Sequence, residues 1–318
     1  MTDASGFSGG GGRWTEAGAE VQSRCEGGGK GLDRAMIDPH VHSPPVALTV
    51  AGSDCSGGAG LQADLKTFAA FGAYGLSAVT CVVSEVPGKV EAVHAVPGEL
   101  VESQVGLLLS GLPVAAAKTG MLFSAEVVRR VSGVLRRAGF GDTCPVVVDP
   151  VMIATSGDPL IEPDAIAAYE ELLFPMAELI TPNLDEAAHL LGWRARGEDD
   201  LARQALELKA RHGCGVLVKG GHLGGAEAID CLLPRGAGAS PQFFRSPFVQ
   251  NVSTHGTGCT TSAAVTAGLA FGRTIEQAVH DAKWFVTAAI ASICRWGCVD
   301  ALNHHFSLPP VSPPPLRR

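Results

Sequence analysis

The sequence lacks the features that mark several broad classes of protein. Aromatic residues make up only 6% of its 318 residues and charged residues 18%, and it has neither a collagen period nor a long low-complexity core. No apolar run approaches the ~20 residues of a membrane-spanning helix, and the start of the chain lacks the apolar stretch of a secretory signal. Hydrophobic residues make up 46%, an ordinary fraction for a globular protein, which excludes wholesale disorder.

Basic residues are scarce as well. The chain has 24 Lys and Arg against 32 Asp and Glu, a formal net charge of −8, and no basic stripe of the kind that nucleic-acid binders carry. We therefore expect neither nucleic acid nor membrane as a partner. An acidic chain that handles phosphate groups must use local donors, such as backbone N–H groups, and a bound cation.

The cysteines do not form the pairs that staple secreted domains. There are nine of them, an odd number with scattered spacing, and no C-x-x-C pair occurs. In a chain of this length, that pattern indicates reduced thiols rather than a disulfide framework. We therefore expect a cytoplasmic protein.

Glycine, in contrast, is abundant. The chain has 40 glycines in 318 residues, and ten of them fall within the first 31. Residues 1–45 are predicted to be a disordered Gly-rich leader, because they show no apolar period. Residues 46–306 are predicted to form one domain, and residues 307–318, with their prolines, an extended tail.

Within residues 46–306, apolar runs of strand length alternate with segments of helical spacing. The predicted strands are 46–51, 76–83, 114–118, 145–148, 178–181 and 215–218, with antiparallel additions at 229–233 and 243–248. The predicted helices are 61–71, 98–110, 125–138, 183–191, 199–212, 257–271 and 275–293. This alternation predicts an α/β fold with a central, mainly parallel β-sheet and helices on both faces. In the helix at 61–71 the residues expected on one face are Leu61, Leu65, Phe68 and Ala69.

The run THGTGCT, from Thr254 to Thr260, precedes an Ala-rich helix. Donors in a glycine-rich turn at a helix N-terminus form an anion hole, and Gly256 and Gly258 let the backbone approach a phosphate closely. Cys259 would lie on the first turn of the helix, where the positive end of the dipole lowers the pKa of a thiol. The alternative is a small-residue helix start with a buried cysteine.

A glycine loop, residues 52–60, follows the first predicted strand. Asp54 stands at the strand end, where a carboxylate can orient a substrate hydroxyl or shape a pocket. A tight strand-to-helix turn with a capping serine is the alternative interpretation.

Polar side chains also follow three later strands. Asp149 comes directly after one strand, Lys219 precedes two glycines after another, and Asn183 and Glu186 lie three residues apart at a helix start. Carboxylates suit Mg²⁺, usually through water, and a lysine suits nucleotide phosphates. Each residue alone could be a cap or a surface residue, but together they match what phosphoryl transfer requires.

Taken in order, these strings resemble the hydroxymethylpyrimidine/phosphomethylpyrimidine kinases of the ribokinase-like superfamily. The resemblance covers residues 46–306 and rests on AGSD (51–54), SGGAG (56–60), QADLKT (62–67), KTGM (118–121), DPVM (149–152), ITPNL (180–184), KGGH (219–222), THGTGCT (254–260) and NHHF (303–306). It implies a three-layer ribokinase-like fold, ATP as co-substrate, Mg²⁺ and a homodimer. The implied activity is phosphorylation of a hydroxymethylpyrimidine and then of its monophosphate, which makes the pyrimidine half of thiamine.

The resemblance also assigns roles to individual residues. It implies that Cys259 acts as a base or a positioning group for the hydroxymethyl, that Lys219 assists catalysis, and that an anion hole is formed by Gly256, Thr257 and Gly258. The implied nucleotide-binding residues are Asn183, Lys219 and Thr257, and the implied metal residues, through water, are Asp149 and Glu186. The implied pyrimidine pocket comprises Gly52, Asp54, Ala59, Val83, Glu85 and Met121.

Glu85 departs from the family pattern. The family has Gln in the run that aligns with Ser84 to Pro87, and that Gln contacts the pyrimidine edge. An ionised carboxylate only accepts hydrogen bonds. It suits an aminopyrimidine, which donates from its amino group and a protonated ring nitrogen, better than the phenolic oxygen of pyridoxal.

Two other functions stay open from the sequence. A pyridoxal kinase of the same subgroup shares the glycine loop and the cysteine. A non-catalytic pyrimidine-sensing protein would bind without turnover, but the presence of Asp149, Glu186, Lys219 and Cys259 argues against it.

Overall fold

The computed structural model describes residues 43–152, 161–221, 223–250, 252–297 and 299–306. The predicted leader lies almost entirely outside the described residues, and the predicted Pro-rich tail lies wholly outside them.

Nine strands form one sheet in the order β3-β2-β1-β4-β5-β6-β7-β8-β9. The six strands from β2 to β7 in this order run parallel to one another. At one edge β3 pairs antiparallel with β2, and at the other β8 pairs antiparallel with β7 and β9 antiparallel with β8. Their bounds are β1 Val46–Asp54, β2 Tyr74–Val86, β3 Lys89–Ala95, β4 Val114–Thr119, β5 Val146–Val148, β6 Leu179–Ile180, β7 Gly215–Lys219, β8 Glu227–Leu233 and β9 Gln242–Pro247. The mainly parallel sheet that the sequence predicts is confirmed.

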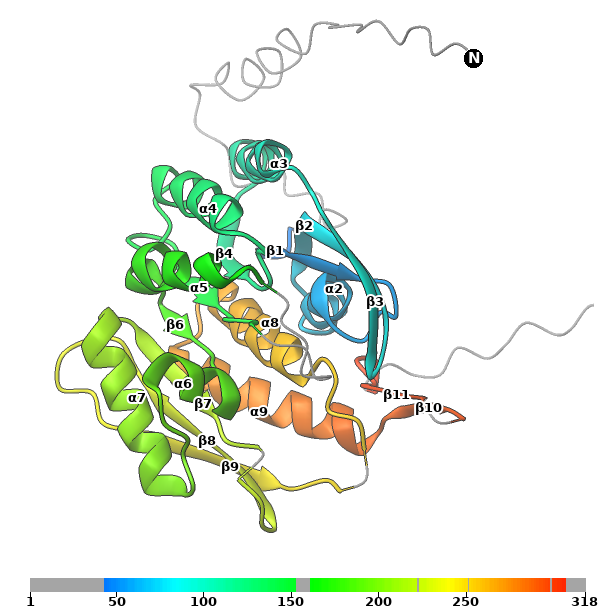
Figure 1. The fold of residues 1–318 in the computed structure, drawn as a ribbon, viewed down its shortest axis with the longest axis vertical. Helices are drawn as coiled ribbons and strands as arrows, with labels where there is room; N and C mark the ends of the chain where they lie inside the picture. Colours follow the sequence, from blue (N-terminus) through cyan, green and yellow to red (C-terminus); the bar gives the residue numbers. More distant parts are fainter. Residues whose placement is uncertain (1–42, 153–160, 222, 251, 298, 307–318) are drawn as a thin grey trace, which may run out of the picture. The chain divides into compact units, whose positions relative to one another are not determined.

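Helices cover both faces of this sheet, which makes three layers (Figure 1). Val146 and Val148 of β5 face a core shared with α3, α4, α5, α6 and α7, whereas Val147 between them faces α8 and α9. Phe68 of α2 packs with α8 on that second face. The helix bounds are α2 Gly60–Ala70, α3 Gly98–Gly111, α4 Ala125–Arg137, α5 Pro163–Ala168, α6 Leu184–Leu191, α7 Glu198–His212, α8 Thr257–Ala270 and α9 Ile275–Ala291. Side chains buried on both faces explain why the strands are continuously apolar.

Local sequence explains where several helices begin and end. Thr274 caps α9 by accepting the N–H of Gln277, whose side chain accepts the N–H of Thr274 in return. The first turn of α7 is acidic and its last turn basic, which complements the helix dipole, and Gly213 ends it in a left-handed conformation.

Some elements were not predicted. The edge strand β3 has mostly exposed side chains, so it lacks the apolar run of a central strand. Helix α5 continues through a π-helical turn, Tyr169–Leu173, and a 3₁₀ turn, Phe174–Met176. Helix α9 ends at Ala291, before the predicted 293, because the chain turns into a small hairpin, β10 Cys294–Trp296 and β11 Val299–Ala301.

The predicted inner face of α2 is partly wrong. Leu61 and Phe68 are buried as expected, but Ala69 is exposed, and Asp64 and Thr67 are buried in its place. The helix is rotated so that Asp64 can meet a buried lysine on β4, described below.

Candidate functional site

The residues predicted for the site line one cavity at the carboxyl ends of the parallel strands. The cavity has a volume of about 970 Å³, and its walls include the ends of β1, β2, β4 and β7 and the first turn of α8. It is lined by every residue predicted for the site, namely Gly52, Asp54, Ala59, Val83, Glu85, Met121, Asp149, Asn183, Glu186, Lys219, Gly256, Thr257, Gly258 and Cys259. The topology thus gathers residues that are up to about two hundred positions apart in the chain, as a doubly wound sheet does.

The turn before α8 presents free backbone donors to this cavity. Gly256 caps the helix with φ at 83°, a left-handed conformation that favours glycine. Thr257 donates its N–H to the carbonyl oxygen of Thr254 at 3.2 Å, whereas the N–H groups of Gly258 and Cys259 have no acceptor in the described part of the chain. These free donors at a helix N-terminus suit an anion.

Two glycine-rich segments touch directly at this turn. A Cβ atom at Gly256 would collide with the carbonyl oxygen of Gly58, and a Cβ atom at Gly58 would lie 2.8 Å from the ring of His255. Both positions therefore require glycine, and the loop after β1 is fixed against the turn before α8.

Cys259 is the third residue of α8 and is half-buried in the cavity wall. Burial raises the pKa of its thiol to about 12. Lys118 and the backbone of Gly60 lower this pKa, but Asp64 and Asp149 raise it further. The predicted lowering of the thiol pKa is therefore wrong, because burial and two carboxylates outweigh the ammonium group of Lys118 and the backbone of Gly60.

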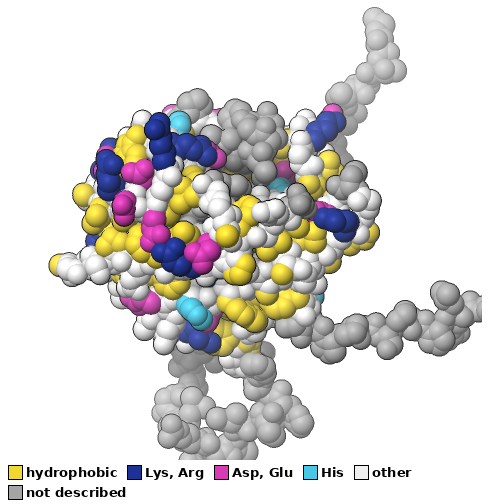
Figure 2. Space-filling view, turned by 90° about the horizontal axis from the view of Figure 1, so that it is seen from below, with side chains coloured by type: hydrophobic (Ala, Val, Ile, Leu, Met, Phe, Trp, Pro, Cys, Tyr) yellow, Lys and Arg dark blue, Asp and Glu magenta, His cyan; other side chains and the backbone are white. Residues whose placement is uncertain are grey.

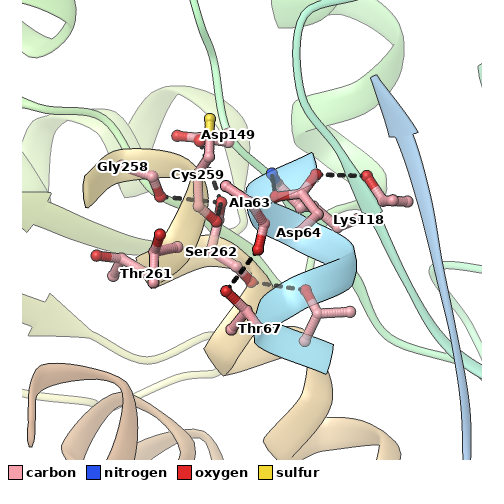
Figure 3. A network of polar contacts seen from close by, with 12 residues as sticks. Ala63, Asp64, Thr67, Lys118, Asp149, Gly258, Cys259, Thr261 and Ser262 are labelled. Atoms are coloured by element: carbon pink, nitrogen blue, oxygen red, sulfur yellow. Dashed lines mark hydrogen bonds and ion pairs between the residues drawn. The ribbon is translucent and has the colours of Figure 1, made fainter. Parts of the chain in front are cut away.

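A buried ion pair lies beside Cys259. Lys118 Nζ on β4 lies 2.5 Å from Asp64 Oδ1 on α2, and both side chains are 0% exposed. Thr49 donates its hydroxyl to the other Asp64 oxygen at 2.7 Å. Figure 3 shows Asp64 and Lys118 next to the first turn of α8, which carries Cys259. The charges of this pair therefore act on the thiol.

At one end of the cavity, Asp149 collects three donors. Its Oδ1 accepts hydrogen bonds from Lys219 Nζ at 3.1 Å and from Thr181 Oγ1 at 3.0 Å, and its Oδ2 accepts one from Ser262 Oγ at 3.1 Å. Burial alone would raise the pKa of Asp149, but Lys219 and the other donors lower it below its usual value. A Cβ atom at Gly258 would lie 3.1 Å from Lys219 Nζ, so a glycine there keeps the lysine close to the free N–H groups.

Asn183 and Glu186 form a capping box at the start of α6. The Asn183 side chain accepts the N–H groups of Asp185 and Glu186, each at 2.9 Å, and Glu186 Oε2 accepts the N–H of Asn183 at 2.8 Å. Burial raises the pKa of Glu186 to about 8, with Lys219 lowering it and Asp149 raising it. The capping interpretation is thus confirmed, and the roles in nucleotide and metal binding stay predictions.

At the other end of the cavity, Asp54 organises the glycine loop. Its carboxylate accepts N–H groups from Ser56 at 2.7 Å, Gly58 at 3.1 Å and Ala59 at 2.7 Å, and it lies 3.1 Å from His255 Nε2. Burial would raise the pKa of Asp54, but the hydrogen bonds from His255, Ser56 and Ala59 lower it to about 2. The bond to Asp54 raises the pKa of His255 despite burial.

Glu85 lies beside this pair, with its backbone held by Cys55. The Cys55 thiol accepts the N–H of Glu85 at 3.3 Å and donates to its carbonyl oxygen at 3.2 Å. Ligand-type atoms of Asp54, Glu85 and His255 all lie within 4.8 Å of one another. Burial and Asp54 raise the pKa of Glu85, and His255 lowers it. The raised pKa of His255 favours its charged form between the two carboxylates.

The sequence analysis missed several residues of the site. His255 stands inside the THGTGCT run, and its spacing from Asp54 gave no sign of their contact. Lys118 and Asp64 stand in recognisable strings too, but they are 54 residues apart, and Ser262 lies just beyond the THGTGCT run, 113 residues from its partner Asp149.

On the face seen in Figure 2, basic and acidic side chains lie side by side rather than in a basic stripe. Among the described residues, no helix is both long and apolar enough to cross a membrane.

Comparison with known proteins finds similarity to phosphomethylpyrimidine kinases and to a pyridoxal kinase. A family model for phosphomethylpyrimidine kinase matches residues 54–302. A hydroxymethylpyrimidine/phosphomethylpyrimidine kinase of Streptomyces coelicolor is 42% identical over 267 residues, covering 84% of this chain and 96% of that protein. The ADP complex of Bacillus subtilis pyridoxal kinase has a TM-score of 0.75 and 34% identity, covering 83% of this chain and 99% of that chain. A phosphomethylpyrimidine kinase from Clostridium difficile has a TM-score of 0.66 and 37% identity, covering 77% and 99%.

Proposed function

The chain belongs to the phosphomethylpyrimidine kinase family and is a phosphotransferase with a ribokinase-like fold, and we propose that it transfers phosphate from ATP to 4-amino-5-hydroxymethyl-2-methylpyrimidine and then to the monophosphate. The observation that carries this proposal is the position of the free N–H groups of Gly258 and Cys259. They lie in one cavity between a carboxylate–lysine cluster and the pocket around Glu85. A phosphoryl group carries negative charge while it is transferred, and N–H groups midway between the two ends of the cavity would stabilise that charge.

The nucleotide belongs at the Lys219 end under this proposal. Lys219 is the cation of that end, and Asn183 and Thr257 line the cavity near it. The ammonium group would pair with phosphate oxygens in place of Asp149, its present partner at 3.1 Å.

Asp149 and Glu186 fit a magnesium ion by the chemistry of their donors. Both are buried carboxylates on the cavity wall, and burial with the charge of Asp149 raises the pKa of Glu186 to about 8. A hard divalent cation, bound through water, would offset this clustering of acids. When bound, Mg²⁺ supplies charge neutralisation of the transferring phosphates.

The pyrimidine ring belongs at the Glu85 end. The walls there are the apolar Val83, Met121 and Ala59, with Gly52 beneath, and Glu85 offers acceptor oxygens. This favours a ring that donates from an amino group over pyridoxal, which presents an oxygen at its edge.

Cys259 would meet the hydroxymethyl group. With its thiol pKa near 12, the residue is neutral at ordinary pH, which favours a positioning role over that of a base that acts early. In phosphoryl transfer with a loose transition state, the hydroxyl can lose its proton late, so a neutral thiol is compatible with turnover.

The test is ATP consumption with hydroxymethylpyrimidine, its monophosphate and pyridoxal, each with and without Mg²⁺. We expect turnover with both pyrimidines, little with pyridoxal, and loss without Mg²⁺. Preference for pyridoxal would establish the alternative vitamin B6 kinase, to which the similarity with the Bacillus subtilis enzyme points. Binding of all three without turnover would establish a pyrimidine sensor.

Two further expectations have supporting observations. The seven described cysteines are free thiols, which supports a reducing compartment such as the cytoplasm. The homodimer implied by the family resemblance stays a prediction, and sedimentation of the purified chain would test it.

A further inference from the structure

The end of the described chain is anchored beside the phosphate-binding turn. Phe306 packs against Trp284 and Phe285 of α9, with ring centroids 5.7 and 5.3 Å apart, and the N–H of Asn303 donates to the carbonyl oxygen of Ala289 at 3.3 Å. This anchoring holds His304 inward, with only 2% of its surface exposed.

His304 makes one contact that leads into the site. Its Nε2 lies 3.0 Å from the hydroxyl oxygen of Thr260, a fully buried residue directly after Cys259. That hydroxyl lies 2.8 Å from the carbonyl oxygen of Gly256, which also accepts the N–H of Thr260 at 2.9 Å. Gly256 is the cap of α8 and the residue pressed against Gly58.

The direction of these hydrogen bonds follows from the atoms. A carbonyl oxygen only accepts, so the short contact between the two oxygens places the hydroxyl proton of Thr260 toward Gly256. In the tautomer that carries its proton on Nε2, His304 donates to the hydroxyl oxygen, and the role inferred below requires that tautomer. These hydrogen bonds run from His304 through the Thr260 hydroxyl to the carbonyl oxygen of Gly256. The backbone continues from Gly256 to the free N–H groups of Gly258 and Cys259.

We infer that His304 is a positioning residue for the phosphoryl-binding turn, acting through Thr260 on the Gly256 carbonyl. An anion hole is effective only when its donors are fixed before the reaction, and a charge-stabilising turn with a glycine cap has little rigidity of its own. The inference rests on the proposed function, because it assigns the turn to the transferring phosphoryl group.

The surroundings of His304 keep its ring in the neutral form. Burial lowers the pKa of His304 to about 4, with Lys66 and His305 lowering it too and the Leu302 backbone raising it. Lys66 in turn donates to the carbonyl oxygen of Gly57 at 2.6 Å. The same lysine therefore acts on His304 and holds the glycine loop.

The experiment compares kcat and KM for hydroxymethylpyrimidine in His304→Leu, His304→Gln and Thr260→Val at a temperature well below each melting point. We expect His304→Leu and Thr260→Val to lower kcat about tenfold with KM for both substrates changed less than about twofold, because the turn acts in the transition state. His304→Gln keeps an N–H donor and should recover most of kcat. His305→Leu, at the exposed neighbouring position, is the matched control and should match the wild type.

The double variant His304→Leu with Thr260→Val decides whether the two act as one chain. If the double variant has a kcat within about twofold of that of Thr260→Val, the inference that His304 acts through Thr260 is supported. If the losses of the two single variants multiply in the double variant, that inference is overturned. A wild-type kcat in His304→Leu, or a lowered melting point with unchanged kcat, would overturn it as well. Should His304→Leu fail to fold, the shape-conserving Thr260→Val carries the same comparison against Thr260→Ser. Failure of the proposed function would show differently, as absent turnover in the wild type.

Discussion

The two ends of the cavity handle charge in opposite ways. At the pyrimidine end, Asp54 is already neutralised by His255 and by backbone N–H groups, which hold its pKa at about 2. At the nucleotide end, the buried carboxylates Asp149 and Glu186 lie next to Lys219, and burial raises the pKa of Glu186 to about 8. Asp54 therefore has its counter-charge within the fold, whereas Asp149 and Glu186 leave an excess of acid that a bound cation would balance.

Removing the thiol between the two ends should have the largest effect. We expect Cys259→Ala to lower kcat by roughly a hundredfold or more, because the hydroxymethyl loses the group that positions it. Binding of nucleotide, measured by calorimetry, should stay within about twofold of the wild type, since Lys219 and Asp149 are untouched. Wild-type turnover in this variant would remove Cys259 from the mechanism.

Removing the ammonium group of Lys219 at the nucleotide end should have the next largest effect. Lys219→Gln should weaken ATP binding roughly 10- to 100-fold, the worth of a charge-assisted bond to phosphate. The affinity for hydroxymethylpyrimidine, measured by the same titration, should not change. A parallel loss of pyrimidine affinity would show that the ends are not independent.

A milder change tests the pyrimidine end. Glu85→Gln restores the family residue and should change kcat/KM for hydroxymethylpyrimidine by about tenfold relative to pyridoxal, because Gln both donates and accepts at the ring edge. Steady-state rates with both compounds give the ratio. An unchanged kcat/KM for every substrate would mean that Glu85 does not read the ring.

The smallest expected effect concerns stability against pH. The lowered pKa of Asp54 contributes stability that is present above its ordinary value near 3.8 and is lost as the pH falls toward about 2. The raised pKa of His255 contributes stability at low pH that is lost as the pH rises through the folded value, above the ordinary 6.5. We expect His255→Leu to lower the free energy of unfolding by about 1 kcal/mol near pH 6, with a smaller difference at alkaline pH, above the raised pKa of His255, as measured by urea unfolding. An identical difference at both values would mean that the loss is one of packing alone.

Local patterns predicted the sheet, and those patterns together with the family resemblance predicted residues that line one cavity. Apolar runs mark central strands, and polar residues such as Asp149 and Lys219 follow them directly, so a parallel topology brings these residues together. The edge strand β3 was missed because its side chains are mostly exposed.

The protonation of the site could not be predicted in the same way. The helix start at Thr257 was visible in the sequence, and it suggested a lowered thiol pKa at Cys259. The opposite result depends first on burial of the thiol and then on Asp64 and Asp149, and all three arise only in the tertiary fold. Helical periodicity placed Ala69 rather than Asp64 on the inner face, because no local rule anticipates a buried partner 54 residues away.

The contact between Gly58 and Gly256 has a consequence for how the protein is made. The two glycines are separated by most of the domain, so the site closes only by one of the longest-range pairings in the chain. During synthesis, β1 and its loop leave the ribosome first, and the turn that completes them follows only when α8 has been translated. Such pairing is slow relative to local contacts. Catalytic competence should therefore appear at the very end of folding, after the sheet is assembled.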